Sequence, residues 1–253
     1  MSLNFSKGNS NSALLIIIIS VVTSVFLSIG VNLTFFAEQE YNEERLGRYV
    51  EDNPEIFIEA MNSYYQAQQQ DRLKSRSKRL ADKKAQVYEE KLDPRVGDAD
   101  AKVKIVEFFD YNCGYCKKAF VNLERLLRDD LDIEIIFKEL PILGASSLIK
   151  AKASVAANML DSSKFFEVHR ALMMGGRITS LEQAADLIYK IGYNRDDLLE
   201  LMQSAEVKEF LEQNRALAQE LGVNGTPAFI IGDEFIDGAV PYETLKLKVK
   251  ELD

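Results

Sequence analysis

The sequence is poor in the residues that bind transition metals or cross-link small folds. It has no tryptophan, a single histidine, His169, and two cysteines, Cys113 and Cys116. A structural zinc site needs four ligands, so a Cys-x-x-Cys pair with one distant histidine argues against zinc. Two cysteines also exclude the class of disulfide-rich secreted scaffolds. We therefore expect no metal site and no disulfide framework.

The chain also lacks an excess of positive charge. Lysine and arginine number 31 against 40 aspartates and glutamates, which gives a net charge of -9, and no basic patch with interleaved aromatics occurs. Such a balance argues against a nucleic-acid partner and predicts an acidic, soluble surface. Hydrophobic residues make up 47% of the chain, which is enough for a substantial core.

A long uncharged segment lies near the N-terminus. No charged residue occurs from Ala13 to Phe36. About 20 apolar residues span the hydrocarbon core of a bilayer, so residues 1–37 are predicted to be a membrane anchor or a signal segment. Lys7 before the segment and the glutamates after it predict that the body lies outside the membrane. The alternative is a signal peptide cleaved after small residues, with a mature start at Val31.

Residues 38–93 are predicted to form a helical stalk. Asn53 followed by Pro54 is typical of an N-cap and first helical position, so a helix is predicted from Pro54 to about Lys91. Its first half has an apolar face between Ile56 and Tyr64. Farther along, an apolar residue recurs every seven positions, at Leu73, Leu80 and Val87. We expect residues 38–92 to join several copies of the chain, and a solvated spacer helix is the alternative.

The two cysteines lie between a predicted strand and a predicted helix. Apolar residues from Val103 to Phe109 predict the strand, and helical spacing from Gly114 to Asp129 predicts the helix. Cys113 would then lie at a helix N-terminus, where free N–H groups and the helix dipole lower the pKa of a thiol. We expect a redox-active pair with no other cofactor. A purely structural disulfide is the alternative, although so small a loop constrains the unfolded chain little.

Glu107 is the only charged residue in the second half of the predicted strand. A carboxylate among apolar residues shortly before Cys113 is expected to be buried beneath the cysteines, where loss of solvent raises its pKa. Glu107 is thus a candidate to accept or relay the proton of Cys116. A carboxylate that faces outward from an edge is the alternative. Lys138, at the end of a parallel strand predicted over 133–137, is a candidate to neutralise Glu107.

The remaining chain predicts a helical insertion and a closing hairpin. Helical patterns between about residues 146 and 205 predict an all-helical subdomain, in which His169 is expected at the core edge or on the surface. The run Ala228–Ile231, a Gly-Asp turn and a second apolar run predict a β-hairpin before a final helix. Pro227 at the strand entrance, after Thr226, is a candidate cis peptide, and a trans bond is the alternative.

Two motifs together resemble the thioredoxin superfamily and, within it, the exported DsbA-like thiol-disulfide oxidoreductases. They are EFFDYNCGYC, from Glu107 to Cys116, and GTPAFIIG, from Gly225 to Gly232. The resemblance covers residues 94–253 and implies an α/β thioredoxin fold with an inserted all-helical subdomain.

The resemblance also implies roles for single residues. Cys113 would attack, Cys116 would resolve the mixed disulfide, and Glu107 would be the buried acid that handles protons. The substrate would be held as an antiparallel strand by Thr226 and a cis Pro227. Gly114 and Tyr115 would lie beside the reactive sulfur.

The dipeptide Gly114-Tyr115 differs from the Pro-His of the strongly oxidising members. Together with Thr226 it is similar to the DsbC and DsbG isomerases and to ScsC-like proteins. Without a histidine between the cysteines, the thiolate loses a stabilising partner, so a less oxidising protein is expected. The stretch from Glu51 to Gln66 also looks like the N-terminal oligomerisation region of ScsC-like proteins.

These observations predict an exported, oligomeric disulfide isomerase or reductase. We expect it on the periplasmic side of the bacterial inner membrane, anchored by residues 13–36, or free in the periplasm after signal cleavage. Its expected partners are exported proteins with cysteines and a membrane redox partner. The alternatives are a monomeric DsbA-like dithiol oxidase and a Cu(I)-binding or holdase protein, since soft thiolates suit Cu(I).

Overall fold

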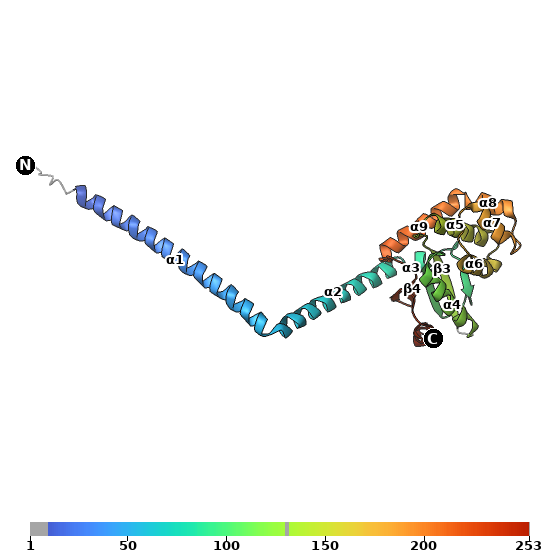
Figure 1. Cartoon of the computed structure of the whole chain (residues 1–253), viewed down its shortest axis with the longest axis horizontal. Helices are drawn as coiled ribbons and strands as arrows, with labels where there is room; N and C mark the ends of the chain where they lie inside the picture. The colour runs from blue at the N-terminus through green and yellow to red at the C-terminus, as the bar shows by residue number, and fades with distance from the viewer. Residues whose placement is uncertain (1–9, 130–131, 253) are drawn as a thin grey trace, which may run out of the picture. The chain divides into compact units, whose positions relative to one another are not determined.

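The computed structural model describes residues 10–129 and 132–252 (Figure 1). The chain divides into two compact units between Gln70 and Asp71. The first unit holds helix α1 (Ser10–Asp52) and the first part of helix α2 (Pro54–Asp82). The second unit holds the cysteines and is called the catalytic unit below.

Helix α1 contains the predicted membrane segment. Within it, Leu15–Leu33 is long and apolar enough to cross a membrane, and its residues are exposed in the single chain. Lys7, on which the predicted orientation partly depends, lies outside the described residues. Whether the segment is an anchor or a signal stays a prediction.

Helix α2 begins at Pro54 as predicted, but it ends at Asp82 and not near Lys91. A short helix α3 (Lys84–Tyr88) follows it directly. No glycine or proline marks this break. It coincides with the burial of Leu80 and Val87 in the catalytic unit, so tertiary packing determines where the helix ends.

A five-stranded sheet forms the centre of the catalytic unit, with strand order β1-β3-β2-β4-β5. The strands are β1 (Arg95–Gly97), β2 (Val103–Phe109), β3 (Ile133–Glu139), β4 (Ala228–Ile231) and β5 (Glu234–Asp237). Strands β2 and β3 are parallel, and β4 is antiparallel to both β2 and β5. The predicted parallel pair and the predicted hairpin are both confirmed.

Helices surround the sheet, and those of the predicted insertion gather on one side of the catalytic unit (Figure 1). They are α5 (Ala145–Leu160), α6 (Phe165–Met174), α7 (Leu181–Tyr189) and α8 (Arg195–Met202), with a 3₁₀ turn at Ser162–Lys164. The other helices are α4 (Gly114–Arg128), α9 (Ala205–Leu221) and α10 (Tyr242–Leu252). Side chains of Ser180, Asn194 and Ser204 accept hydrogen bonds from the first turns of α7, α8 and α9, as N-cap residues do.

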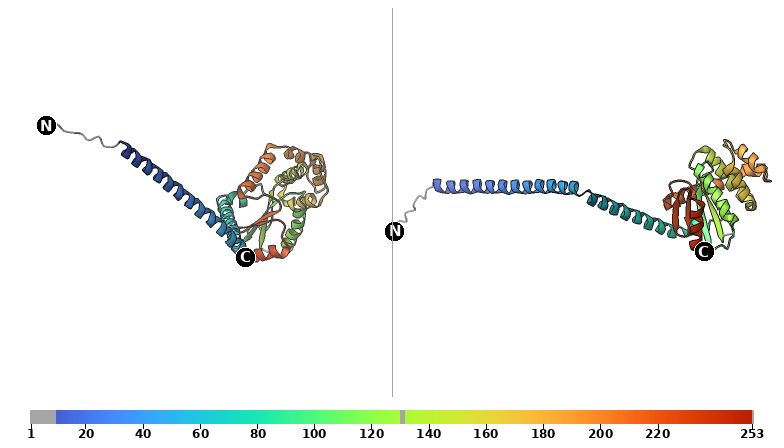
Figure 2. Two further views of the ribbon diagram at one scale, coloured as in Figure 1. Left: turned by 60° about the vertical axis from the view of Figure 1, so that its left-hand side comes forward. Right: turned by 60° about the horizontal axis from the view of Figure 1, so that its bottom comes forward.

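Helices lie on both sides of the sheet (Figure 2), and apolar side chains form a core on each of its faces. Ile105 and Phe109 of β2 pack into one core with α4, α6 and α10, whereas Val106 and Phe108 pack into a second core with α9. Strand β2 is therefore buried along nearly its whole length. This explains why its sequence is almost continuously apolar around Glu107.

Residues 71–93 pack with the catalytic unit, although the sequence analysis placed them in the stalk. Leu80 and Val87 belong to the second core. Arg76 forms two hydrogen bonds to the carboxylate of Asp237, at 2.7 and 3.0 Å, and lies 4.1 Å from the ring centre of Phe235. These contacts fix the end of α2 to the edge strand β5.

Candidate active site

The cysteines follow the central strand β2 across a tight turn. The carboxylate of Asp110 accepts a hydrogen bond from the backbone N–H of Asn112 at 2.7 Å, and the Cys113 N–H donates to the Asp110 carbonyl at 3.0 Å. The second carboxylate oxygen accepts the backbone N–H groups of Ile142 and Leu143, at 2.8 and 2.9 Å. Asp110 thus ties the turn to the loop after β3.

Cys113 is the N-cap residue of α4, as predicted, and both thiols are free in this structure. The Cys113 thiol donates to the backbone carbonyl of Thr226 at 3.2 Å. The Thr226-Pro227 peptide bond is cis, so the cis alternative considered from the sequence is the one found. Cys113 is 7% exposed, whereas Cys116 is fully buried behind it.

The two thiols have opposite acidities. Burial raises the pKa of Cys113, but hydrogen bonding with the Thr226 side chain and with the backbone N–H groups of Cys116 and Tyr115 outweighs it, and the net pKa lies below its ordinary value. Burial, reinforced by the negative charge of Glu107, raises the pKa of Cys116 far above its ordinary value. Cys113 is therefore the thiol that ionises first.

Glu107 is fully buried, as predicted, and the alternative of an outward-facing carboxylate is wrong. Neither of its carboxylate oxygens has a hydrogen-bond partner among the described residues. Burial is the main cause that raises the pKa of Glu107 well above its ordinary value, and the negative charge of the nearby Cys113 thiolate adds to it. A carboxylate whose pKa is raised by burial is a stronger base than a solvated one, so Glu107 in its ionised form can accept the proton of Cys116, the role that the sequence predicts.

Lys138 does not neutralise Glu107, and that expectation is wrong. Glu107 pairs in register with Phe137, whereas Lys138 pairs with Phe108. Neighbouring residues along a strand point to opposite faces of the sheet. Lys138 therefore lies on the face opposite to the cysteines.

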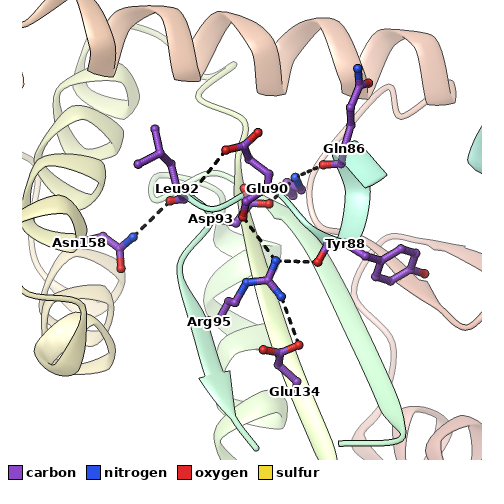
Figure 3. Close-up of polar contacts among 9 residues, drawn as sticks. Gln86, Tyr88, Glu90, Leu92, Asp93, Arg95, Glu134 and Asn158 are labelled. Atoms are coloured by element: carbon purple, nitrogen blue, oxygen red, sulfur yellow. Dashed lines mark hydrogen bonds and ion pairs between the residues drawn. The ribbon is translucent and has the colours of Figure 1, made fainter. Parts of the chain in front are cut away.

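On that opposite face, Lys138 is fully buried and forms an ion pair with Asp93, which is also fully buried. Its ammonium donates to the Gln86 carbonyl at 2.6 Å. Figure 3 shows Asp93 within a wider polar set, in which Arg95 contacts Glu134 at 3.2 Å. Burial raises the pKa of Asp93 to about 7 and lowers that of Lys138, and each charge partly offsets the effect on the other.

His169 is not at the core edge or on the surface, as the sequence analysis expected. It is fully buried, and burial lowers its pKa to about 3. Its ring centre lies 4.9 Å from that of Phe109, 4.5 Å from that of Phe137 and 5.3 Å from that of Phe165. Only one local signal, the adjacent aromatic pair Phe165 and Phe166, could have indicated this.

A buried polar network that was not predicted from the sequence lies on the cysteine side of the sheet. The Tyr111 hydroxyl lies 2.8 Å from the Ser154 hydroxyl and 2.9 Å from Nδ1 of His169. Glu139 is also buried there, and burial raises its pKa well above the ordinary value. Its neighbour in the register is Phe109, so it lies on the same face as Glu107. The local sequence around Glu139 gives no signal of this network.

The Gly114-Tyr115 dipeptide forms the exposed rim of the cysteine turn. Tyr115 is 65% exposed, and the Lys118 ammonium lies 5.4 Å from its ring centre. A Cβ atom on Gly114 would meet no other atom within 4 Å. The rim is thus open to an approaching polypeptide. Within the described ranges, no group of three or more histidine, cysteine or acidic residues is arranged to hold a metal ion.

A family model described as thioredoxin matches residues 89–251. Among curated proteins, the chain is similar to disulfide bond formation protein D of Bacillus subtilis, with 25% identity over 171 residues, 64% of this chain and 77% of the relative. It also matches two Na⁺/H⁺ antiporters of Salinispora, of which it spans 24% of the length.

Two solved structures are similar over most of their length. The thiol-disulfide exchange protein alpha-DsbA2 from Wolbachia pipientis is 33% identical, with 72% of this chain and 98% of that chain covered and a TM-score of 0.67. A linker-deletion mutant of ScsC from Proteus mirabilis is 29% identical, with 85% and 95% covered and a TM-score of 0.65. The predicted thioredoxin fold with a helical insertion is therefore confirmed.

Proposed function

The chain belongs to the thioredoxin family, and from this membership we propose that it isomerises or reduces disulfides in exported proteins. It is a thiol-disulfide oxidoreductase of the DsbA and ScsC type. The proposal adds the direction of the reaction, the class of substrate and the assembly of the protein.

The observation that carries this proposal is the opposite acidity of the two thiols. Cys113, with its lowered pKa, is ready to attack as a thiolate, whereas the buried Cys116 holds its proton. Only a thiolate can resolve a mixed disulfide, so slow ionisation of Cys116 prolongs the life of that intermediate. A long-lived mixed disulfide gives the substrate time to rearrange its own disulfides.

The reaction begins when the Cys113 thiolate attacks one sulfur of a substrate disulfide. That disulfide breaks, a mixed disulfide forms, and the other substrate sulfur leaves as a thiolate. In isomerisation, a substrate thiolate then attacks the mixed disulfide, which frees Cys113 with no net transfer of electrons. In reduction, Cys116 attacks instead, gives its proton to Glu107 and forms the Cys113–Cys116 disulfide. A membrane redox partner must then return two electrons.

Thr226 and Pro227 form the docking wall in this proposal. Their cis peptide lies beside Cys113, at the entrance to strand β4. An extended substrate segment that pairs with this backbone would gain main-chain hydrogen bonds with little dependence on its sequence. Such indifference suits a protein that acts on many clients.

Assembly through residues 38–92 and an anchor at residues 13–36 complete the proposal. In the single chain, the side chains of Phe57, Ile58 and Tyr64 are more than half exposed. Several copies joined through this face would present several Cys113 thiolates to one client at a high effective concentration. Sedimentation of the full-length protein in detergent tests this, with Phe57→Glu as the disrupting variant and Glu59→Lys as the control. A monomer in the unaltered protein would refute the assembly.

Trapping the cellular redox state tests the direction of electron flow. Free thiols are blocked in living cells, and the reduced and oxidised forms are then separated by mass. A mostly reduced Cys113–Cys116 pair supports the isomerase or reductase. A mostly oxidised pair supports the second candidate, a monomeric dithiol oxidase, which the similarity to disulfide bond formation protein D favours.

The Cys116→Ala variant tests whether the protein acts on exported proteins. Without the resolving thiol, mixed disulfides between Cys113 and its clients should accumulate and be visible after separation without reductant. A Cys113→Ala/Cys116→Ala variant is the matched control. If Cys116→Ala traps no more exported protein than this control does, the proposed enzymatic function fails and the Cu(I)-binding or holdase alternative is favoured.

A further inference from the structure

A pocket of about 510 Å³ lies beside the cysteine turn. Three basic residues from different parts of the chain line it, Lys117 of α4, Lys150 of α5 and Arg177 of the loop after α6, and no acidic residue is among its lining residues in the described part of the chain. This concentration of positive charge is unexpected in a chain with a net charge of -9. We call it the basic pocket.

The basic pocket adjoins the reactive cysteines on both sides of the Cys-x-x-Cys motif. Asn112, which lines the pocket, directly precedes Cys113, and Lys117 directly follows Cys116. The side chain of Asn112 donates to the Ser147 hydroxyl at 3.0 Å. This bond fixes the cysteine turn to the first turn of α5. A group bound in the pocket would therefore be close to the attacked disulfide.

Lys150 is the most informative residue of the pocket, because it is only 1% exposed. Its ammonium has three protons, and among the described residues one of them is donated to the Leu172 carbonyl at 3.0 Å. Burial is the main cause that lowers the pKa of Lys150 to about 8, and repulsion from the charge of Lys117 adds to it. A buried ammonium with a like charge nearby is stabilised by an anion.

Asp110 is the one carboxylate whose charge opposes these effects at Lys150. It does not line the pocket, and its two oxygens accept backbone hydrogen bonds from the cysteine turn and from the loop after β3. The single negative charge of Asp110 therefore does not balance the three positive charges of the pocket. Among the described residues, Lys117, Lys150 and Arg177 form no ion pair.

The first turn of α5 adds hydrogen-bond donors to the same pocket. Its N-cap is Gly144, which offers no side chain to cap the helix. The hydroxyl of Ser146 lines the pocket, is shielded from solvent and has no hydrogen-bond partner among the described residues. Free N–H groups at a helix N-terminus favour an anion, and here they act together with three side-chain cations.

We propose that the basic pocket binds a carboxylate carried by the disulfide substrate. This inference rests on the proposed thiol-disulfide exchange at Cys113 and adds a preference for substrates with an acidic group near the attacked sulfur. The carboxylate belongs either to an acidic side chain of a client protein or to a small disulfide with carboxyl groups. Both sources present the same chemistry to Lys117, Lys150 and Arg177.

The test compares two small disulfides that differ in charge, dithiobis(nitrobenzoate), which has carboxylates, and uncharged dithiodipyridine. The reduced full-length protein in mild detergent reacts with each. Cys113 attacks one sulfur and an aromatic thiolate leaves; Cys116 then attacks the mixed disulfide, and a second thiolate leaves. The protein loses two electrons and two protons, and the probe becomes two coloured thiol products. The measured quantity is the initial rate with dithiobis(nitrobenzoate) divided by the initial rate with dithiodipyridine.

We expect this ratio to fall roughly three- to fivefold in Lys117→Gln and in Arg177→Gln, as for loss of one partly exposed charge partner. In Lys150→Gln it should fall about tenfold or more, because burial reduces screening. Benzoate, a carboxylate without a sulfur, should slow the reaction with the charged probe and leave the reaction with the uncharged probe unaffected. The matched control is Lys118→Gln, since Lys118 is the adjacent lysine and does not line the pocket.

A ratio that stays constant in all three pocket variants would overturn the proposal. An equal fall in Lys118→Gln would overturn it too, because it would indicate a general field and no defined site. Failure of the unaltered protein to react with either disulfide would instead reject the proposed function, and the pocket proposal with it. Disulfide peptides with glutamate or glutamine beside the cysteine distinguish the two sources. A Glu-over-Gln preference that the pocket variants abolish assigns the carboxylate to a client protein.

Discussion

The buried pair of Lys138 and Asp93 gives the sharpest prediction about stability. In Lys138→Met, the Asp93 carboxylate loses its charge partner in a site that excludes water, and the Gln86 carbonyl loses its donor at 2.6 Å. Removal of one member of a buried ion pair costs about 3–5 kcal/mol. For a unit of this size, each kcal/mol lowers the Tm by about 2–4 °C. We therefore expect the Tm to fall by roughly 6–20 °C.

The size of this loss should depend on pH. The pKa of Asp93 in the folded protein is about 7, above its ordinary value of 3.8, so the folded state holds this proton more tightly than the unfolded state. The stability that this tighter binding contributes is complete below about pH 4 and is lost as the pH rises through about 7. Near pH 6 Asp93 is protonated with or without Lys138, so Lys138→Met should cost less there than at about pH 8.5.

Thermal unfolding of the full-length protein in mild detergent, followed by circular dichroism at both pH values, measures these effects. Lys104→Met is the matched control, because Lys104 lies on the neighbouring strand, is 38% exposed and contacts Glu134 at 3.2 Å. Its loss should cost no more than about 1 kcal/mol. In Asp93→Leu/Lys138→Met, both charges are gone, and the loss should be smaller than in Lys138→Met. Additive losses in the double variant would refute the coupling of the two charges.

Three further predictions concern the active-site side and the edge of the sheet. Glu107→Gln should slow the resolution of a mixed disulfide about 10²-fold or more, because Cys116 loses its proton acceptor. Stopped-flow decay of a mixed disulfide measures this rate, and an unchanged rate would contradict the role of Glu107 as proton acceptor. His169 has a pKa of about 3 when folded and 6.5 ordinarily, so the unfolded state takes up more protons below about pH 6.5 and stability falls as the pH falls. Between pH 7 and pH 5 the free energy of unfolding should fall by about 2 kcal/mol from this cause, and this contribution should be absent in His169→Phe. Denaturant titrations measure it, and an equal pH dependence in the unaltered protein and the variant would count against it. Arg76→Ala should lower stability by about 1 kcal/mol, because its ion-pair partner Asp237 is largely exposed. The same titrations would detect a larger or absent effect.

Much of the fold follows from local sequence signals. The strand β2, the cysteine turn, helix α4 and the β4–β5 hairpin were predicted because each has a continuous pattern that its own residues determine. The burial of Glu107 was predictable for the same reason. The cysteines lie in these elements and the cis proline directly precedes β4, so the centre of the candidate site could be located from the sequence.

The features that the sequence analysis missed depend on contacts between distant segments. Lys138 lies on the wrong face for Glu107 because one position along a strand reverses the direction of the side chain. Leu80 and Val87 recur at heptad spacing, yet they are buried in the catalytic unit, whereas Leu73 of the same series is exposed. Helical periodicity identifies an apolar face and does not say which surface covers it.

The basic pocket shows the same limit. Lys117, Lys150 and Arg177 are far apart in the sequence and belong to three different segments. No spacing rule connects them, because the helical insertion brings them together.

The packing of residues 71–93 means that the family boundary and the folding boundary of this protein differ. The family model begins at residue 89, whereas Leu80 and Val87 share a core with Val106 and Phe108 of the central strand. A gene fragment cut at the family boundary would encode every residue of the candidate active site and still lack two apolar side chains that help to cover one face of its sheet. A transfer of residues 89–251 alone to another protein would leave this core without Leu80 and Val87.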